Sequence, residues 1–148
     1  LSGHMFFTDN FYGHDDEAYA TLRLLSYLTR VGKSLVEAID ELPQYKSSPE
    51  IKVACPDAVK FELISGKITA DIKKAFPEAE YVDIDGIRFD TENEMGVIRA
   101  SQNGPYITVK YEGRDEEGYK KMRTIISQIL HKYSEVNFKE GVNTDALD

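Results

Sequence analysis

Between residues 81 and 111 the sequence alternates apolar and polar residues in short stretches separated by turn signals. The first two stretches, residues 81–84 and 87–90, lie on either side of Asp85-Gly86. This dipeptide is typical of a two-residue hairpin turn. Residues 96–100 and 106–111 are two further stretches of the same kind. Because parallel strands need a connection of about a dozen residues or more, strands this close together must pair antiparallel.

Two helical patterns flank these strands. One covers residues 57–76 and ends before Pro77, and its predicted apolar face contains Phe61, Ile64, Ile68, Ile72 and Ala75. The other covers residues 115–132, and a short strand is expected near residues 51–55. These elements predict an α+β fold, with a mostly antiparallel sheet of about four strands and two helices on one face. Polar residues 134–148 predict a frayed end.

Residues 1–44 have a different character. Asp15 and Asp16 are candidate caps for a helix that ends near Gly32, and Ser34 with Glu37 fits the capping box of a second helix. No second sheet is expected here. We therefore predict a boundary at residue 44, with residues 45–148 the α+β domain and residues 1–44 either the end of a neighbouring domain or an arm packed on this one.

Charge and cysteine content exclude several classes of function. The chain has 18 basic and 26 acidic residues and a net charge of −8, which disfavours binding to nucleic acids and to anionic membranes. The single cysteine, Cys55, cannot form an internal disulfide, so a reducing cytoplasm is expected. No apolar run approaches the roughly 20 residues of a membrane span. The three histidines and Cys55 have no metal-ligand spacing, so no metal site is predicted.

The best candidate for chemistry is residues 99–105, RASQNGP. The guanidinium of Arg99 can bind two phosphate oxygens at once, and Ser101, Gln102 and Asn103 add neutral donors. Gly104 allows the backbone to bend so that successive N–H groups converge on an anion. The same residues also fit a polar hairpin turn that follows a surface arginine, and spacing alone does not decide between the two interpretations.

This segment resembles the C-terminal domain of the phosphomannomutase/phosphoglucomutase family, in which a DG(I/V) hairpin precedes an R-A-S-N-T-x-P loop that binds the substrate's phosphate. Upstream, residues 2–7 resemble the family's G-E-x-S-G-H-x-F sugar-binding loop, and residues 13–24 resemble the G-x-D-D-x-x-Y-A-x-L-R-L helix that follows it. The resemblance covers about residues 1–133. The glutamate of the sugar loop would lie immediately before Leu1, which predicts that the chain is part of a longer one.

The resemblance implies roles for individual residues. Arg99, Ser101, Gln102 and Asn103 would bind the substrate phosphate, although Gln102-Asn103 stands where the family usually has Asn-Thr. Ser2 and His4 would bind sugar hydroxyls, with His4 as an accessory acid or base. The implied fold is the TATA-binding-protein-like C-terminal domain of the phosphohexomutases, preceded by helices from the end of the sugar-binding α/β domain.

The family interconverts hexose 1-phosphates and 6-phosphates through a phosphoserine and a hexose 1,6-bisphosphate intermediate. The serine loop and the Mg²⁺-binding D-G-D-x-D-R motif are absent from this sequence, and residues 83–88 match the latter only superficially. We therefore expect Mg²⁺ to bind outside this chain, no catalytic residue within it beyond His4, and no activity of the chain alone. Its partners would be a phosphorylated hexose and the remaining domains of the parent. A stand-alone module that binds a phosphometabolite or a protein is the alternative.

Overall fold

A computed structural model describes residues 3–148. The chain forms two compact units, Leu1–Gln44 and Tyr45–Asp148. That the first unit is the end of a sugar-binding domain stays a prediction. Each unit is described by itself.

The first unit contains two helices. Helix α1 (Glu17–Val31) begins where the Asp16 side chain accepts the Tyr19 N–H, and it ends at Gly32, whose φ of 66° is left-handed. Helix α2 (Leu35–Asp40) has the predicted capping box of Ser34 and Glu37. No residue of either helix is buried. Apolar side chains of both helices, such as Leu22, Leu25 and Ile39, are exposed in the described unit.

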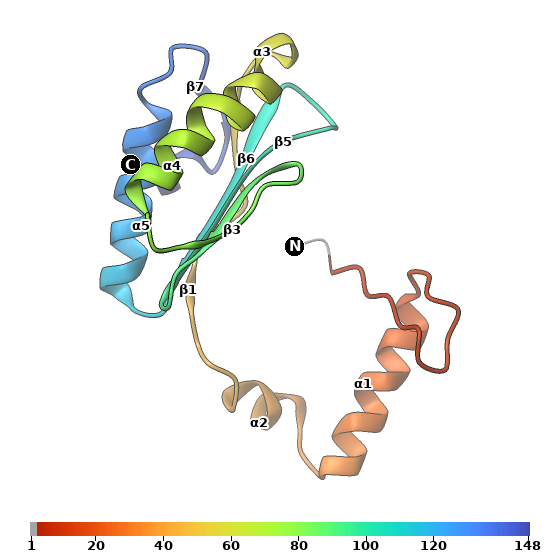
Figure 1. The fold of residues 1–148 in the computed structure, drawn as a ribbon. Coiled ribbons are helices and arrows are strands. Elements are labelled where there is room, and N and C mark those ends of the chain that lie inside the picture. Colours follow the sequence, from red (N-terminus) through yellow and green to blue (C-terminus); the bar gives the residue numbers. More distant parts are fainter. Residues whose placement is uncertain (1–2) are drawn as a thin grey trace. The chain divides into compact units, whose positions relative to one another are not determined.

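The second unit is built on an antiparallel sheet of seven strands, rather than the expected four or so. Along the sheet the order is β3-β4-β5-β6-β2-β7, and β1 also pairs with β6 (Figure 1). The bounds of the strands are β1 Lys46–Ser47, β2 Ile51–Ala54, β3 Glu80–Val82, β4 Gly86–Asp90, β5 Glu94–Ala100, β6 Tyr106–Gly113 and β7 Asn137–Val142.

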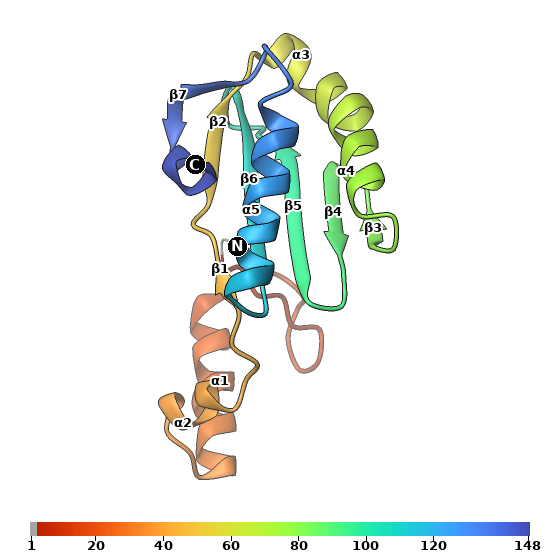
Figure 2. The same ribbon diagram turned by 90° about the vertical axis from the view of Figure 1, so that its left-hand side faces the viewer.

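The helices cover one face of this sheet (Figure 2). Helix α3 (Asp57–Glu62), the π-helical segment η1 (Leu63–Ile68) and α4 (Thr69–Ala75) follow one another without a break, and α5 (Glu116–Leu130) lies beside them. Their buried residues pack on alternate strand residues such as Phe89, Ile98 and Val109 to form one core. The α+β class with two helices on one face is confirmed.

The C-terminal residues were expected to fray, and this expectation is wrong. Strand β7 pairs with β2, and the short 3₁₀ helix η2 (Thr144–Leu147) follows it. Leu147 is buried, and the Tyr111 hydroxyl donates a hydrogen bond to the Ala146 carbonyl. Val136 is buried as well, and Phe138 and Ala146 pack against the core, so a few apolar side chains anchor a polar segment that has no periodic pattern of its own.

The register of the β3–β4 hairpin also differs from the prediction. Val82 pairs with Arg88, so residues 83–87 lie between the paired positions, and Asp85-Gly86 is not a two-residue turn. Gly86 instead begins β4 opposite Arg99, with a φ of 147°. A Cβ at Gly86 would lie 2.4 Å from the Ile98 carbonyl oxygen. Glycine is required here by the close approach of β4 to β5.

Candidate functional site

The predicted phosphate-binding residues lie together at one end of β5. Arg99 belongs to β5, and residues 101–105 form the β5–β6 loop, next to α3 (Figure 1). The Ser101 N–H donates to the Tyr106 carbonyl at 2.9 Å, and the Ser101 Oγ accepts the Asn103 N–H at 3.2 Å. Gln102 and Asn103 are exposed. The loop is therefore closed by its own bonds while its amide side chains face solvent.

Two backbone donors of this loop are free. Among residues 3–148, the N–H groups of Gln102 and Gly104 donate to no protein acceptor. Backbone N–H groups that converge in a turn are a common binding site for anions. The loop thus offers two uncharged donors to a ligand.

Arg99 supplies the positive charge beside these donors. Its side chain is 48% exposed, and its Nη2 lies 2.9 Å from the Asp85 Oδ2 of the β3–β4 loop. A guanidinium carries five N–H donors, so Asp85 occupies only part of it. The contact orients Arg99 and leaves donors for an oxyanion.

Lys60 contacts the same loop from the protein interior, and the sequence analysis missed it. Its residue exposure is 2%, and its Nζ donates to the carbonyl groups of Ser101 and Gly104 and pairs with the Asp57 carboxylate. Of the predicted apolar face, Ile64, Ile68 and Ile72 are buried, but Phe61 is 52% exposed and Ala75 is also exposed, and Lys60 takes the buried position that was assigned to Phe61. The buried positions are four residues apart, at Lys60, Ile64, Ile68 and Ile72. That spacing was the available signal.

A pocket of about 240 Å³ adjoins the loop. Its lining includes Phe61, Ile64 and Thr69 of the helical segment together with Asp85 and Gln102. The Thr69 hydroxyl is buried and has no hydrogen-bond partner among the described residues. The pocket gives a ligand at the β5–β6 loop an adjoining space that is partly apolar.

The predicted sugar-loop residues belong to the other unit. His4 Nδ1 contacts the Asp15 carboxylate, and this hydrogen bond lowers the pKa of Asp15. The carboxylate also accepts the Met5 N–H at 3.2 Å, so the segment of His4 and Met5 is held to Asp15. Ser2 lies outside the described residues. The roles of both residues in sugar binding stay predictions.

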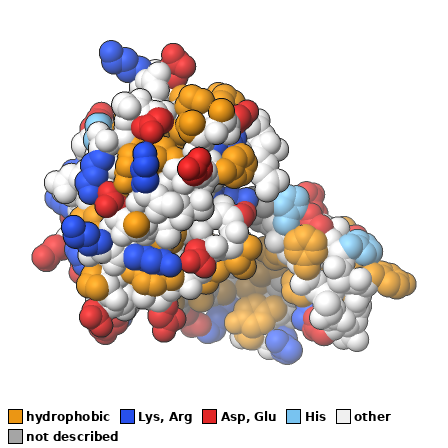
Figure 3. Space-filling model, turned by 45° about the horizontal axis from the view of Figure 1, so that its top comes forward, with side chains coloured by type: hydrophobic (Ala, Val, Ile, Leu, Met, Phe, Trp, Pro, Cys, Tyr) orange, Lys and Arg blue, Asp and Glu red, His pale blue; other side chains and the backbone are white. Residues whose placement is uncertain are grey.

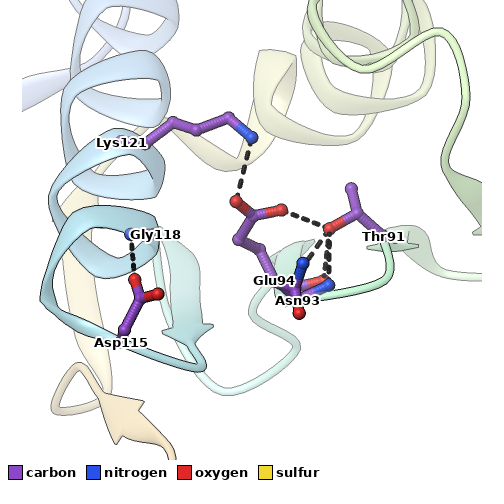
Figure 4. Close-up of polar contacts among 6 residues, drawn as sticks. All are labelled: Thr91, Asn93, Glu94, Asp115, Gly118 and Lys121. Atoms are coloured by element: carbon purple, nitrogen blue, oxygen red, sulfur yellow. Dashed lines mark hydrogen bonds and ion pairs between the residues drawn. The ribbon is translucent and has the colours of Figure 1, made fainter.

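The opposite end of β5 has a turn of similar sequence, the β4–β5 turn (residues 91–94). The Thr91 Oγ1 accepts the N–H groups of Asn93 and Glu94, and its hydroxyl contacts the Glu94 carboxylate (Figure 4). Lys121 of α5 lies 2.9 Å from the same carboxylate. Burial acts to raise the pKa of Glu94, but the bonds from Thr91 and Lys121 outweigh it and lower the pKa. This turn satisfies its own charge.

Among the described residues no metal centre competes with the β5–β6 loop, and on the face drawn in Figure 3 no broad charged patch does. Within residues 3–148, no three His, Cys, Asp or Glu side chains are grouped so that they could hold a metal ion. On the face drawn in Figure 3, acidic and basic side chains are interspersed with hydrophobic ones. Within the described part of the chain, no helix combines the length and apolar character required to cross a bilayer.

Comparisons with known proteins relate the chain to one group of enzymes. No family model matches it. It is 31% identical over 132 residues to a phosphomannomutase/phosphoglucomutase of Pseudomonas putida, covering 88% of the chain and 28% of the relative. It is 36% identical over 107 residues to a phosphoglucosamine mutase of Methanococcus maripaludis, covering 72% of the chain and 23% of the relative.

A solved structure agrees with these sequence matches. The crystal structure of a phosphoglucomutase/phosphomannomutase family protein from Burkholderia thailandensis matches with a TM-score of 0.72 and 32% identity. The match covers 89% of this chain and 27% of that one. The chain therefore spans between 23% and 28% of the length of the relatives named here.

Proposed function

The chain belongs to the phosphomannomutase/phosphoglucomutase family, and we propose that it forms the part of a phosphohexomutase that binds the phosphate group of the substrate. One observation carries the proposal. The β5–β6 loop presents two free backbone N–H groups, and the half-exposed Arg99 lies near the end of the strand that leads into this loop. Arginine and backbone amides together are well suited to a phosphate dianion.

The proposed parent reaction moves a phosphoryl group between the 1 and 6 positions of a hexose through a phosphoserine and a hexose 1,6-bisphosphate. Arg99, Ser101, Gln102 and Asn103 would bind the phosphate that is not reacting. Because the sugar must bind in two orientations, the site has to recognise the phosphate more than the ring. Binding there would draw this domain over the cleft and exclude water from the reacting phosphate. Ser2 and His4 would contact sugar hydroxyls.

Catalysis would depend on other parts of the parent. Phosphoryl transfer requires a nucleophile and charge neutralisation at one centre, which Mg²⁺ supplies in the family. The described residues offer no side-chain cluster that fits a metal ion, so we assign no step within this chain to Mg²⁺. We expect the chain alone to bind a hexose phosphate without converting it. Conversion of mannose 1-phosphate to mannose 6-phosphate by the purified chain would contradict this expectation.

The binding role is tested by titration calorimetry of this chain with glucose 6-phosphate. Arg99→Ala should weaken binding by about tenfold or more, because charge-assisted contacts to phosphate are lost. Arg88→Ala is the matched control: Arg88 lies on the neighbouring strand and pairs with Asp90 at 2.7 Å, away from the loop. Equal effects of both substitutions, or no binding by the wild type, would contradict the proposed function.

A further inference from the structure

Lys60 is a buried cation that bonds to the β5–β6 loop and to Asp57. Its ammonium group has three N–H donors. The described structure offers three acceptors, the carbonyl oxygens of Ser101 and Gly104 and the carboxylate of Asp57. Two of the three belong to the β5–β6 loop, 41 and 44 residues away from Lys60 in the sequence. A lysine with 2% exposure is rare unless its charge is fully satisfied.

The hydrogen bond from Lys60 to the Ser101 carbonyl sets the direction in which the Gln102 N–H points. The carbonyl of Ser101 and the N–H of Gln102 belong to one peptide unit, and the structure has no cis peptide bond. In a trans peptide the C=O and N–H point in opposite directions. By holding the Ser101 carbonyl inward, Lys60 turns the Gln102 N–H away from α3. That N–H is one of the two free donors of the loop.

The bond to Gly104 fixes the other end of the loop. The Gly104 carbonyl accepts from Lys60 at 2.7 Å and from the Tyr106 N–H at 2.8 Å. Pro105 follows and has no N–H of its own. Lys60 therefore fixes both ends of the segment that carries Gln102 and Asn103, and its positive charge lies directly behind the anion site.

We propose that Lys60 is a positioning residue that holds the β5–β6 loop in its phosphate-binding form, an inference that rests on the proposed function of that loop. It contacts the loop carbonyls, and the loop contacts the ligand. Asp57, whose side chain is 68% exposed, completes the coordination of the ammonium from the solvent side.

A packing role and a positioning role predict opposite rankings of two substitutions. Lys60→Met keeps the length and apolar stem but removes all three donors. Lys60→Arg keeps the charge and the donors but is larger. If Lys60 only fills space, Met should be tolerated better; if it holds the carbonyls, Arg should bind glucose 6-phosphate better than Met. We expect about tenfold weaker binding for Met and at most about threefold weaker binding for Arg.

A second measurement does not depend on the ligand. In the free chain, Lys60→Met should speed hydrogen exchange at the Asn103 and Tyr106 amides by about tenfold while core amides such as those of Val109 and Ile126 stay protected. Lys110→Met is the matched control, because the Lys110 Nζ also binds a backbone carbonyl, that of Ser48, but not the β5–β6 loop. If Lys60→Met does not fold, Lys60→Gln replaces it in both measurements.

The outcomes separate this proposal from the proposed function. Absence of glucose 6-phosphate binding by the wild type would contradict the function, while loop exchange would still test the role of Lys60. Normal binding by the wild type, with Met equal to Arg and unchanged exchange at Asn103, would overturn the positioning role and leave the function intact. Faster loop exchange and weaker binding in Met, with recovery in Arg, would support it.

Discussion

The β4–β5 turn and the β5–β6 loop, at the two ends of β5, share one hydrogen-bonding pattern but differ in how exposed the neighbouring charged side chain is. In each, a hydroxyl accepts the N–H of an asparagine two residues later: Thr91 from Asn93 at 3.3 Å, and Ser101 from Asn103 at 3.2 Å. In the β4–β5 turn the charged group is Glu94, 11% exposed and bound by Thr91 and Lys121. In the β5–β6 loop the charged group is Arg99, 48% exposed.

The same hydroxyl-to-amide hydrogen bond therefore occurs in a turn with and in a turn without the features of a binding site, and it does not by itself make one. In the β4–β5 turn the Glu94 carboxylate is bound by Thr91 and by Lys121 of α5 (Figure 4), and the Glu94 N–H, the counterpart of the free Gly104 N–H, donates to Thr91. In the β5–β6 loop the internal charge is the cation Lys60, which binds carbonyl groups and leaves N–H groups free. The anion of the β4–β5 turn, Glu94, is already bound within the protein. The cation at the β5–β6 loop, Lys60, binds carbonyl groups and so leaves N–H groups available to an external anion.

The largest expected effect is structural and concerns the strand beneath Arg99. Gly86→Ala would place a Cβ 2.4 Å from the Ile98 carbonyl oxygen and 2.7 Å from the Arg99 Cα, at a positive φ. We expect the free energy of unfolding to fall by about 2–4 kcal/mol. Gly66→Ala is the control, because a Cβ there meets nothing within 4 Å. Urea unfolding measures both, and an equal loss for the two variants would refute the close-approach account.

Glu94→Gln should break the closed turn without affecting phosphate binding. It removes the charged acceptor of Lys121, and we expect a loss of about 1 kcal/mol at pH 7. Glu92→Gln, at an exposed neighbouring position, should cost almost nothing. Urea unfolding at neutral pH checks the difference between the two.

The free energy of unfolding should also depend on pH through the Glu94 carboxylate. The pKa of Glu94 is below its ordinary value of 4.5 in the folded chain, so the folded state favours the charged form. The stability it contributes is therefore fully present above about pH 4.5 and is lost as pH falls through the lowered value. Unfolding curves of wild type and Glu94→Gln should converge in that range. A gap that stays constant down to pH 2 would be inconsistent with this assignment.

The smallest effects are expected from removing the hydroxyls of Thr91 and Ser101. The first substitution should mainly lower stability, and the second should mainly weaken ligand binding. Thr91→Ala should lower stability by about 1 kcal/mol and leave phosphate binding unchanged. Ser101→Ala should cost less stability, about 0.5 kcal/mol, and weaken glucose 6-phosphate binding by about threefold. Unfolding and calorimetry of both variants give the four values. Equal binding losses would mean that the two ends of β5 are not functionally distinct.

Local patterns in the sequence were sufficient for the α+β class, for both helices of the second unit and for the position of the candidate loop. Alternation and helical spacing depend on neighbours in the chain, and Ile64, Ile68 and Ile72 face the core as expected. The identity of the loop residues came from a family resemblance that the comparisons confirm.

What the sequence did not predict depends on contacts between distant residues. The hairpin register is set by Gly86 against Arg99, and β7 is held by pairing with β2 and by burial of Leu147. Lys60 was overlooked because a lysine in a helix is normally exposed, and its acceptors are 41 and 44 residues away in the sequence. Only the folded chain brings them together.

The most direct test of the account is an amide chemical-shift titration of the chain with glucose 6-phosphate. The account predicts that the Gln102 and Gly104 amides shift most, that Asn103 follows, and that the Asn93 and Glu94 amides do not move. Arg99→Ala should abolish the shifts at Gln102 and Gly104. Shifts of equal size at both ends of β5, or none at Gln102 and Gly104 while the ligand binds elsewhere, would contradict it.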